Sequence, residues 1–248
     1  MIRASVTVQS ARAEALRARF IELAPEGFEE IEHPQTVELA VYGPAAERVL
    51  AAFADASVGT VEDGWEERWR AFHQPVEIGP LWIGPPWQQP PGGLIAVVIE
   101  PGRAFGTGAH PTTRLCLELM LDQQRGSLID LGCGSGVLGI AAAALGFTPV
   151  LGVDLDPVAV EVARTNARVN AAQVEVRQLD VGAQALPQAS LAVANIAAEV
   201  IAALGSGLRS PRAITSGYRS VDHPQPVGFR SVRRVELDGW AADLFVRA

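Results

Sequence analysis

The sequence lacks lysine altogether and contains only two cysteines, Cys116 and Cys133. Two scattered cysteines exclude a disulfide framework, and no group of cysteine and histidine residues has the spacing of a zinc site. We therefore expect the reducing cytosol as the compartment of this protein, and no bound metal.

Net positive charge and long apolar runs are also missing. The formal net charge is −8, which disfavours a general nucleic-acid binder because such binding depends on cations that meet phosphates. No apolar run reaches the roughly 20 residues of a membrane helix, and the N-terminus carries no apolar signal segment. These absences predict a soluble monomer without stable binding to nucleic acid or membranes, whose charge suits a basic protein partner.

The first 61 residues predict a small mixed domain. Apolar alternation and helical spacing indicate a β-α-β-β-α-β order, which is the split βαβ pattern of ferredoxin-like modules. The expected elements are, in turn, residues 4–8, 11–23, 28–31, 36–41, 45–53 and 57–61. Because these residues show no catalytic pattern, we interpret residues 1–61 as a packing or recognition domain.

Residues 62–93 change in character and predict a linker. Trp65 and Trp69 are four residues apart, so that a helix would place both rings on one face. Prolines then crowd residues 80–93, and at that density they disfavour both a helix and a central strand. We expect a helical and proline-rich linker over 62–93 and a third segment over 94–248.

A glycine turn is the most informative stretch of that third segment. A buried strand over 128–131 runs into Gly132, Gly134 and Gly136, and then into an apolar helix. Glycines let the backbone pass close beneath a ligand, and the free amides at a helix N-terminus favour polar or anionic groups. The Gly-x-Gly-x-Gly spacing differs from the Gly-x-Gly-x-x-Gly of dinucleotide sites. The turn predicts an adenosine-bearing cofactor, with a nicotinamide-dependent oxidoreductase as the alternative.

Three apolar strands after this turn each end in a polar residue: Asp154, Asp180 and Asn195. In an open parallel sheet ligands bind beyond the carboxyl ends of the strands, and an acid about twenty residues after the glycine turn can accept both ribose hydroxyls. Asp154 fits that role. Asp156, which precedes Pro157, fits the start of a helix. Asp180 and Asn195 are also compatible with ordinary turn chemistry at a strand end.

The glycine-rich segment 101–113 predicts a lid. Its glycines at 102, 106 and 108 allow the chain to wrap closely round a flat, polar ligand, and Pro111 then begins a helix. His110 has a pKa range suitable for a base, but a loop histidine before proline more often starts a helix.

The C-terminal residues predict how the sheet ends. Strands over 231–237 and 242–246 pair most simply as an antiparallel hairpin through Asp238 and Gly239. We therefore expect an α/β fold with a Rossmann-like, mostly parallel sheet that ends in an antiparallel hairpin, as is typical of methyltransferases.

The motifs at residues 130–136 and 152–157 resemble those of class I S-adenosylmethionine-dependent methyltransferases. More narrowly, residues 100–113 and the run Ala194-Asn195-Ile196 resemble the family of bacterial methyltransferases that modify protein eleven of the large ribosomal subunit. The segment from Trp65 to Trp87 is similar to the linker of that family, and the N-terminal module to its substrate-recognition domain.

This resemblance implies methyl transfer from S-adenosylmethionine to lysine side chains and an α-amine of the ribosomal protein, with S-adenosylhomocysteine as the product. It implies Asn195 and Thr107 as the catalytic residues. It implies a set of cofactor-binding residues on the lid, the glycine turn and the strand ends: Phe105, Thr107, Gly108, Thr113, Gly132, Cys133, Gly134, Gly136, Asp154, Leu155, Asp180 and Asn195.

Two departures from the family pattern leave alternatives open. The run Asn195-Ile-Ala-Ala198 lacks the proline and aromatic residues of the Asn-Pro-Pro-Tyr motif of many amine methyltransferases, and residues 208–227 are shorter than the usual pattern. The first departure does not support aromatic stacking on a planar amide or base, and the second leaves one wall of the site undefined. A methyltransferase that acts on RNA or a small molecule is an alternative, as is a cofactor-binding protein without activity.

Overall fold

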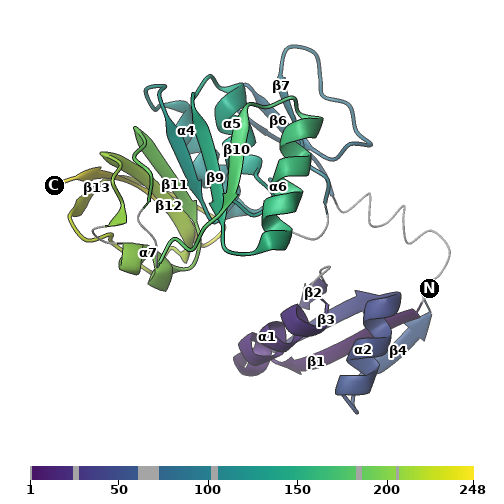
Figure 1. Ribbon diagram of the computed structural model, residues 1–248. Helices are drawn as coiled ribbons and strands as arrows, with labels where there is room; N and C mark the ends of the chain where they lie inside the picture. The colour runs from purple at the N-terminus through teal and green to yellow at the C-terminus, as the bar shows by residue number, and fades with distance from the viewer. Residues whose placement is uncertain (1, 25–27, 61–72, 102–105, 183–185, 205–206) are drawn as a thin grey trace. The chain divides into compact units, whose positions relative to one another are not determined.

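The computed structural model describes residues 2–24, 28–60, 73–101, 106–182, 186–204 and 207–248. The chain divides between Phe72 and His73 into two compact units, and each unit is a separate fold (Figure 1). The expected helix around Trp65 and Trp69 lies outside the described residues, as does Phe105. In the described part of the chain, no helix has the length and apolar character that crossing a membrane requires.

The N-terminal unit has the expected β-α-β-β-α-β order. Its antiparallel sheet has the strand order β2-β3-β1-β4. The elements are β1 (Ile2–Gln9), η1 (Ser10–Arg12), α1 (Ala13–Leu23), β2 (Glu29–Glu32), β3 (Thr36–Tyr42), α2 (Pro44–Ala52) and β4 (Ser57–Thr60). Both helices pack on the sheet through one apolar cluster, in which Phe20 is fully buried and its ring lies 5.5 Å from Phe28 and 5.8 Å from Phe53.

The C-terminal unit is built on a seven-stranded sheet of order β10-β9-β8-β11-β12-β14-β13. Neighbouring strands are parallel from β10 to β12, whereas β14 is antiparallel to both β12 and β13. The elements of this sheet and its helices are α4 (Pro111–Leu121), β8 (Leu128–Leu131), α5 (Val137–Ala144), β9 (Val150–Asp154), α6 (Pro157–Val169), β10 (Val174–Gln178), β11 (Leu191–Asn195), α7 (Ala198–Leu204), β12 (Arg212–Arg219), β13 (Phe229–Leu237) and β14 (Trp240–Arg247).

The terminal hairpin is confirmed. It turns at Asp238 and Gly239, whose φ angles are 51° and 76°, as a type I′ turn requires. The expected Rossmann-like sheet with an antiparallel ending is thus present.

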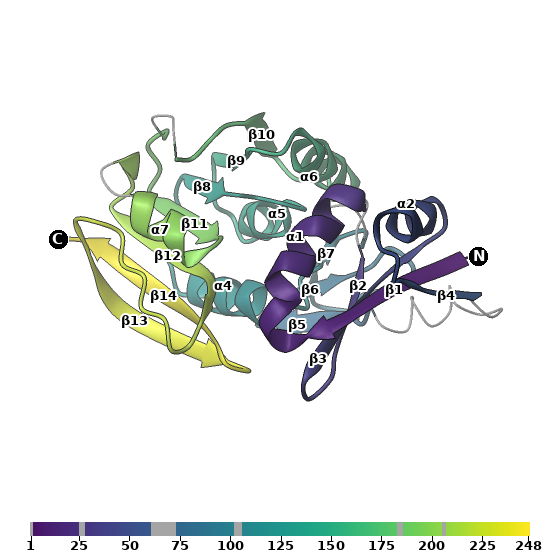
Figure 2. The same cartoon turned by 90° about the horizontal axis from the view of Figure 1, so that it is seen from below.

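Apolar side chains cover both faces of this sheet, as a parallel sheet between helices requires. Leu128, Val193 and Ile214 pack with α4 and α5 on one face, and the intervening Ile129 and Ala194 pack with α7 on the other. Figure 2 shows the sheet between these helices. Because β8, β9, β11 and β12 run parallel, their carboxyl ends meet at one edge.

The proline-rich tract contains a central strand, contrary to the expectation from its composition. β6 (Leu81–Gly84) lies between β5 (Val76–Ile78) and β7 (Ile95–Val98) in a second, three-stranded sheet, and all four of its residues are buried. The physical reason is local: the prolines at 80, 85 and 86 flank β6, and no residue of the strand itself is proline. The remaining prolines lie in the connection from β6 to the parallel strand β7.

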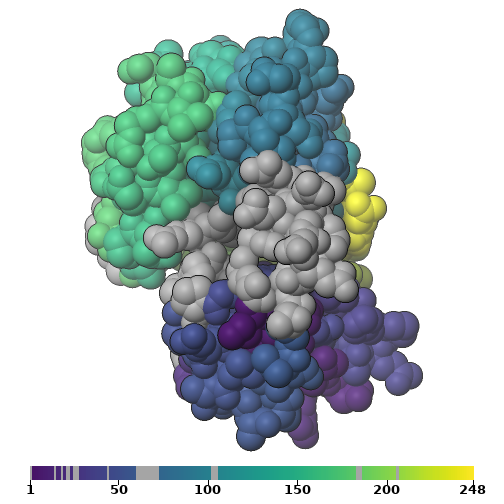
Figure 3. Space-filling view, turned by 90° about the vertical axis from the view of Figure 1, so that its right-hand side faces the viewer, coloured from purple at the N-terminus to yellow at the C-terminus, as the bar shows by residue number. Residues whose placement is uncertain are grey.

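Asn170, the residue that ends α6, links that helix to the small sheet. Asn170 receives a hydrogen bond of 2.7 Å from the backbone N–H of Val98 and donates one of 2.7 Å to its carbonyl. Figure 3 shows this region (blue) beside the α6 region (green) on one face of the unit. The small sheet therefore forms a fixed wall next to α5 and α6.

The connection from β12 to β13 is short. Residues 220–228, all of which the structure describes, contain turns and irregular backbone and no helix. Since β12 and β13 run in the same direction on either side of β14, this loop replaces the helix that commonly crosses over such a pair.

Candidate active site

The glycine turn after β8 has a backbone that only glycine adopts readily. Gly132, Gly134 and Gly136 have φ angles of 69°, 53° and 82°. The N–H groups of Gly132 and Cys133 donate to the carbonyl of Val153 over 2.8 and 2.9 Å. A Cβ on Gly132 would lie 2.5 Å from Cγ2 of Ile196. The turn is thus pinned to β9 and covered by the residue that follows Asn195.

Asp154 lies against this turn, as the sequence predicts. Its Oδ2 accepts a hydrogen bond of 2.8 Å from the N–H of Gly134, and its Oδ1 accepts one of 3.0 Å from Asp156. Leu155 is 63% exposed beside it, which leaves apolar surface next to the carboxylate. Asp156 caps α6 by accepting from the N–H of Val158 at 2.8 Å, as expected, while the ribose role of Asp154 stays a prediction.

A second carboxylate, Asp130 on β8, was not identified from the sequence. Asp130 is 1% exposed, and its Oδ2 accepts a 3.0 Å hydrogen bond from the N–H of Gly139. Burial raises the pKa of Asp130 to about 7; the Gly139 hydrogen bond opposes this shift and the charge of Asp154 adds to it. Within the described part of the chain, Oδ1 of Asp130 is buried without a hydrogen-bond partner. A carboxylate within an otherwise apolar buried strand was the signal that could have identified it.

The lid segment contacts the glycine turn through Ser135. The hydroxyl of Ser135 donates 2.6 Å to the carbonyl of Gly106 and accepts from the N–H of Val137 at 3.3 Å. Gly106 and Gly108 have φ angles of 106° and 93°, and the partly exposed Thr107 lies between them. The described part of the lid is therefore tied to the turn, and Ser135, which the sequence reasoning left out, makes the link.

Gly108 fixes the other side of the lid. A Cβ at this position would lie under 3.0 Å from Cγ2 of Ile83 on β6. The small sheet thus provides the surface on which the lid rests, which explains why a glycine is needed at 108.

Asn195 and Thr113 are brought together at the end of β11. The amide Nδ2 of Asn195 donates to Oγ1 of Thr113 over 3.3 Å, across 82 positions of the chain. Thr113 is completely buried in the first turn of α4. With its nitrogen engaged, the Asn195 amide keeps its oxygen as the side-chain acceptor at this edge of the sheet.

His110 starts the helix α4. Its Nδ1 accepts from the N–H of Thr112 and lies 2.8 Å from the hydroxyl of the same residue. Burial lowers the pKa of His110 and thereby favours the neutral ring. Its ring meets Trp240 edge-on at 4.9 Å, and Arg219 lies 4.9 Å over Trp240. These contacts support the helix-start role and connect α4 to the terminal hairpin.

Asp180 forms a local turn in which its Oδ1 accepts from the N–H of Gly182 at 2.9 Å. The hydrogen bonds described for this part of the chain do not join Asp180 to the glycine turn. Its backbone neighbour Leu179 donates to the carbonyl of Asp154, so the strand end is near, but the adenine role of Asp180 stays a prediction.

The opposite edge of the sheet carries a hollow without these motifs. It has a volume of about 560 Å³ and is bordered by the amino ends of β8, β9 and β10, including Ser127, Pro149 and Gln173. Since open parallel sheets bind ligands at their carboxyl ends, the edge with Asp154 and Asn195 is the better candidate.

This arrangement agrees with the comparison to known families. A family model described as ribosomal protein L11 methyltransferase (PrmA) matches residues 37–217. The chain belongs to this family. The matched range contains the lid, the glycine turn, Asp154 and Asn195, while the terminal hairpin lies beyond it.

Individual relatives of the PrmA family are also similar to the chain. The ribosomal protein L11 methyltransferase of Symbiobacterium thermophilum is 37% identical over 213 residues, covering 75% of this chain and 66% of the relative. That of Caldanaerobacter subterraneus is 39% identical over 149 residues, covering 56% and 47%. The chain thus spans about half to two thirds of the length of these relatives.

This chain also matches nearly the whole length of one solved structure. The ribosomal protein L11 methylase from Lactobacillus delbrueckii subsp. bulgaricus matches with a TM-score of 0.62 at 26% identity, covering 71% of this chain and 99% of that one.

Proposed function

We propose that this protein transfers methyl groups from S-adenosylmethionine to amines of ribosomal protein L11. The observation that carries the proposal is the meeting of two pairs, Asp154 with Gly134 and Asn195 with Thr113, at one edge of the sheet. Membership of the PrmA family supports the choice of substrate.

The residues at the glycine turn fit this cofactor. Gly132 and Gly134 are the partly exposed members of the turn, Asp154 offers acceptors for ribose hydroxyls, and exposed Leu155 offers apolar contact for the adenine ring. The buried, unpartnered Oδ1 of Asp130 is an acceptor suited to an ammonium group. When bound, the cofactor supplies an electrophilic methyl group on a sulfonium. The other members of the proposed cofactor set are Phe105, Thr107, Gly108, Thr113, Cys133, Gly136, Asp180 and Asn195, and the proposed reaction uses no metal.

The acceptor nitrogen needs a free lone pair, whereas a lysine is protonated at neutral pH. Desolvation at the end of β11 favours the neutral amine, and the proton leaves to water. Asn195 then accepts a hydrogen bond from the amine through its side-chain oxygen and directs the lone pair at the methyl group. Thr107 and Gly108 of the lid close over the site. Catalysis on this account is chiefly alignment.

The substrate specificity is proposed to extend to lysine side chains and the α-amine of L11. Residues 1–61 serve as the recognition domain. The expected linker 62–93 is shortened to residues 62–72 and the catalytic domain begins at His73, because the chain divides there and β5 and β6 form one sheet with β7. The net charge of −8 suits a basic ribosomal protein, and we propose action as a monomer in the cytosol.

The test is incubation of the purified protein with L11 and isotopically labelled S-adenosylmethionine, followed by intact-mass measurement and peptide mapping. We expect mass increments of whole methyl groups on lysines and the N-terminus. Labelling of RNA or of a small molecule instead of L11 would redirect the assignment, and calorimetric binding of NAD but not of S-adenosylhomocysteine would overturn it.

Asn195→Ala tests the proposed role of Asn195 in methyl transfer. It should lower turnover at least about tenfold, since it removes an aligning group, while S-adenosylhomocysteine affinity changes little. Unchanged turnover in a folded Asn195→Ala variant would remove Asn195 from the mechanism without affecting the cofactor assignment.

A further inference from the structure

Strand β12 contains a β-bulge directly beside Asn195. Ser216 pairs with Asn195 on one side and with Ala242 on the other, after which the register with β14 shifts so that Tyr218 pairs with Ala241. Gly217 is the extra residue, with a φ of 103°. Bulges next to functional sites commonly redirect the adjoining chain, so what Gly217 touches is relevant to the site.

Gly217 presses against the peptide group of Ile196. A Cβ at Gly217 would lie well under 3.0 Å from the carbonyl oxygen of Ile196. The N–H of Ile196 donates 3.0 Å to the carbonyl of Ser216, and Ser216 is itself held by a 2.7 Å hydrogen bond from its hydroxyl to the carbonyl of Ala241. The bulge thus holds Ile196, the residue directly after Asn195, and Ile196 also covers Gly132.

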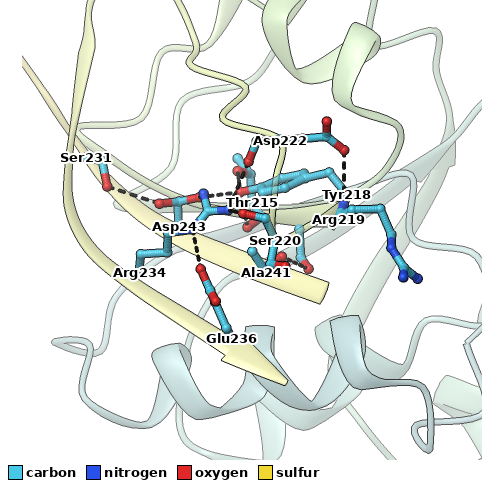
Figure 4. A network of polar contacts seen from close by, with 11 residues as sticks. Thr215, Tyr218, Arg219, Ser220, Asp222, Ser231, Arg234, Glu236, Ala241 and Asp243 are labelled. Carbon is cyan, nitrogen blue, oxygen red and sulfur yellow. Dashed lines mark hydrogen bonds and ion pairs between the residues drawn. The ribbon is translucent and has the colours of Figure 1, made fainter. Parts of the chain in front are cut away.

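The hydroxyl of Tyr218 links the two ends of the bulge through hydrogen bonds. It lies 2.8 Å from Oγ1 of Thr215, 3.0 Å from the Thr215 carbonyl and 2.9 Å from Oδ2 of Asp243. Figure 4 shows the side chain of Tyr218 extending toward Thr215 and Asp243. Because Thr215 precedes the bulge and Tyr218 ends it, these hydrogen bonds fix both of its ends.

Asp243 anchors this lock to the last two strands. It is 4% exposed, and it accepts a 2.8 Å charged hydrogen bond from Nη1 of Arg234 and a 3.1 Å one from the hydroxyl of Ser231. Arg234 also donates to the carbonyls of Ser220 and Asp222 in the loop after β12, as Figure 4 shows. The polar network therefore covers the sheet where a crossover helix is missing and leads directly to the bulge.

We propose that Tyr218 is a positioning residue for methyl transfer, which acts by holding the bulge at Gly217 and through it the Asn195–Ile196 segment. The inference rests on the proposed function for its link to catalysis. Tyr218 touches neither acceptor nor cofactor in this scheme; it sets where the peptide after Asn195 lies.

The test compares Tyr218→Phe with Ser231→Ala. The first variant removes the hydroxyl that closes the bulge, while the second removes another donor to the same Asp243 carboxylate and leaves the bulge intact. We expect Tyr218→Phe to lower kcat about tenfold with KM for L11 and the Kd of S-adenosylhomocysteine within about twofold. Ser231→Ala should keep the wild-type kcat although both variants lose some melting temperature.

Hydrogen exchange gives a second readout that does not need activity. Tyr218→Phe should accelerate exchange of the Ile196 amide, and Ser231→Ala should not. If Tyr218→Phe lowers the melting temperature but leaves kcat unchanged, or if both variants lose kcat equally, Tyr218 has a structural role only. If the wild type itself methylates no L11, the proposed function fails, while the exchange comparison still decides whether Tyr218 holds the Asn195–Ile196 segment.

Discussion

The amide nitrogen of Asn195 donates a 3.3 Å hydrogen bond to the hydroxyl of Thr113, which joins the end of β11 to the first turn of α4. Because this contact engages the nitrogen, it sets which face of the amide offers its oxygen. Thr113 thereby controls the orientation of the proposed catalytic side chain without touching the acceptor.

We expect Thr113→Val to lower methyl-transfer kcat about tenfold or more, because it keeps the shape of the side chain and removes the hydroxyl that orients Asn195. Thr113→Ser keeps the hydroxyl and should retain most of the activity. Steady-state kinetics with L11 measure both. Equal activity of the valine and serine variants would show that the hydrogen bond does not orient Asn195.

Two neighbouring aspartates have different predicted effects: Asp154 on cofactor affinity and Asp156 on the stability of α6. Asp154→Ala should weaken S-adenosylhomocysteine binding roughly 10- to 100-fold, because it removes charged acceptors and the partner of the Gly134 N–H. Asp156→Ala removes the N-cap of α6, which costs about 1 kcal/mol of the free energy of unfolding, and should leave the affinity nearly unchanged. Titration calorimetry measures the affinity and urea unfolding the stability of both variants. Loss of affinity in Asp156→Ala with unchanged affinity in Asp154→Ala would contradict the assignment.

Asp130 predicts a pH dependence of stability. Its pKa is raised to about 7 in the folded protein by burial, so between pH 4 and pH 7 the unfolded chain has released this proton while the folded chain retains it. This group therefore lowers the free energy of unfolding as the pH rises through that interval. Asp130→Asn keeps an uncharged side chain of the same shape at every pH.

We expect Asp130→Asn to be more stable than the wild type at pH 8, by about 4 kcal/mol at most, and to lose this advantage near pH 4. Urea unfolding of the cofactor-free protein at a series of pH values measures the difference, in which other titrating groups cancel. Parallel pH profiles of the two proteins would mean that Asp130 ionises normally in the fold.

Much of the fold could be predicted from local sequence signals. The hairpin follows from Asp238-Gly239 between two apolar runs, and the place of Asp154 follows from its spacing after the glycine turn. Both are properties of short segments whose chemistry fixes the backbone. The strand β6 was missed because the density of prolines was judged over the whole tract, whereas a strand needs only a few consecutive residues that are free of proline.

The contacts that complete the candidate site could not be predicted in the same way. Ser135 reaches Gly106 across 29 positions and Asn195 reaches Thr113 across 82, so each depends on how distant elements pack. Gly217 lies in an ordinary-looking strand, and its bulge exists only because β14 pairs with β12 on both sides of it. Nothing within three or four neighbouring residues encodes such a relationship.

The contact between Gly217 and Ile196 yields the last prediction, with Gly228 as its matched control. Both glycines have left-handed backbones, with φ angles of 103° and 81°, so alanine at either costs about 1–2 kcal/mol in backbone strain. A Cβ at Gly228 meets nothing within 4 Å, whereas one at Gly217 collides with the Ile196 backbone. Gly217→Ala should therefore lose more stability in urea unfolding than Gly228→Ala. Only Gly217→Ala should lower kcat, because the peptide after Asn195 must move to make room for the alanine side chain. Equal losses of stability with unchanged kcat would mean that this peptide shifts freely and that its position does not limit the reaction.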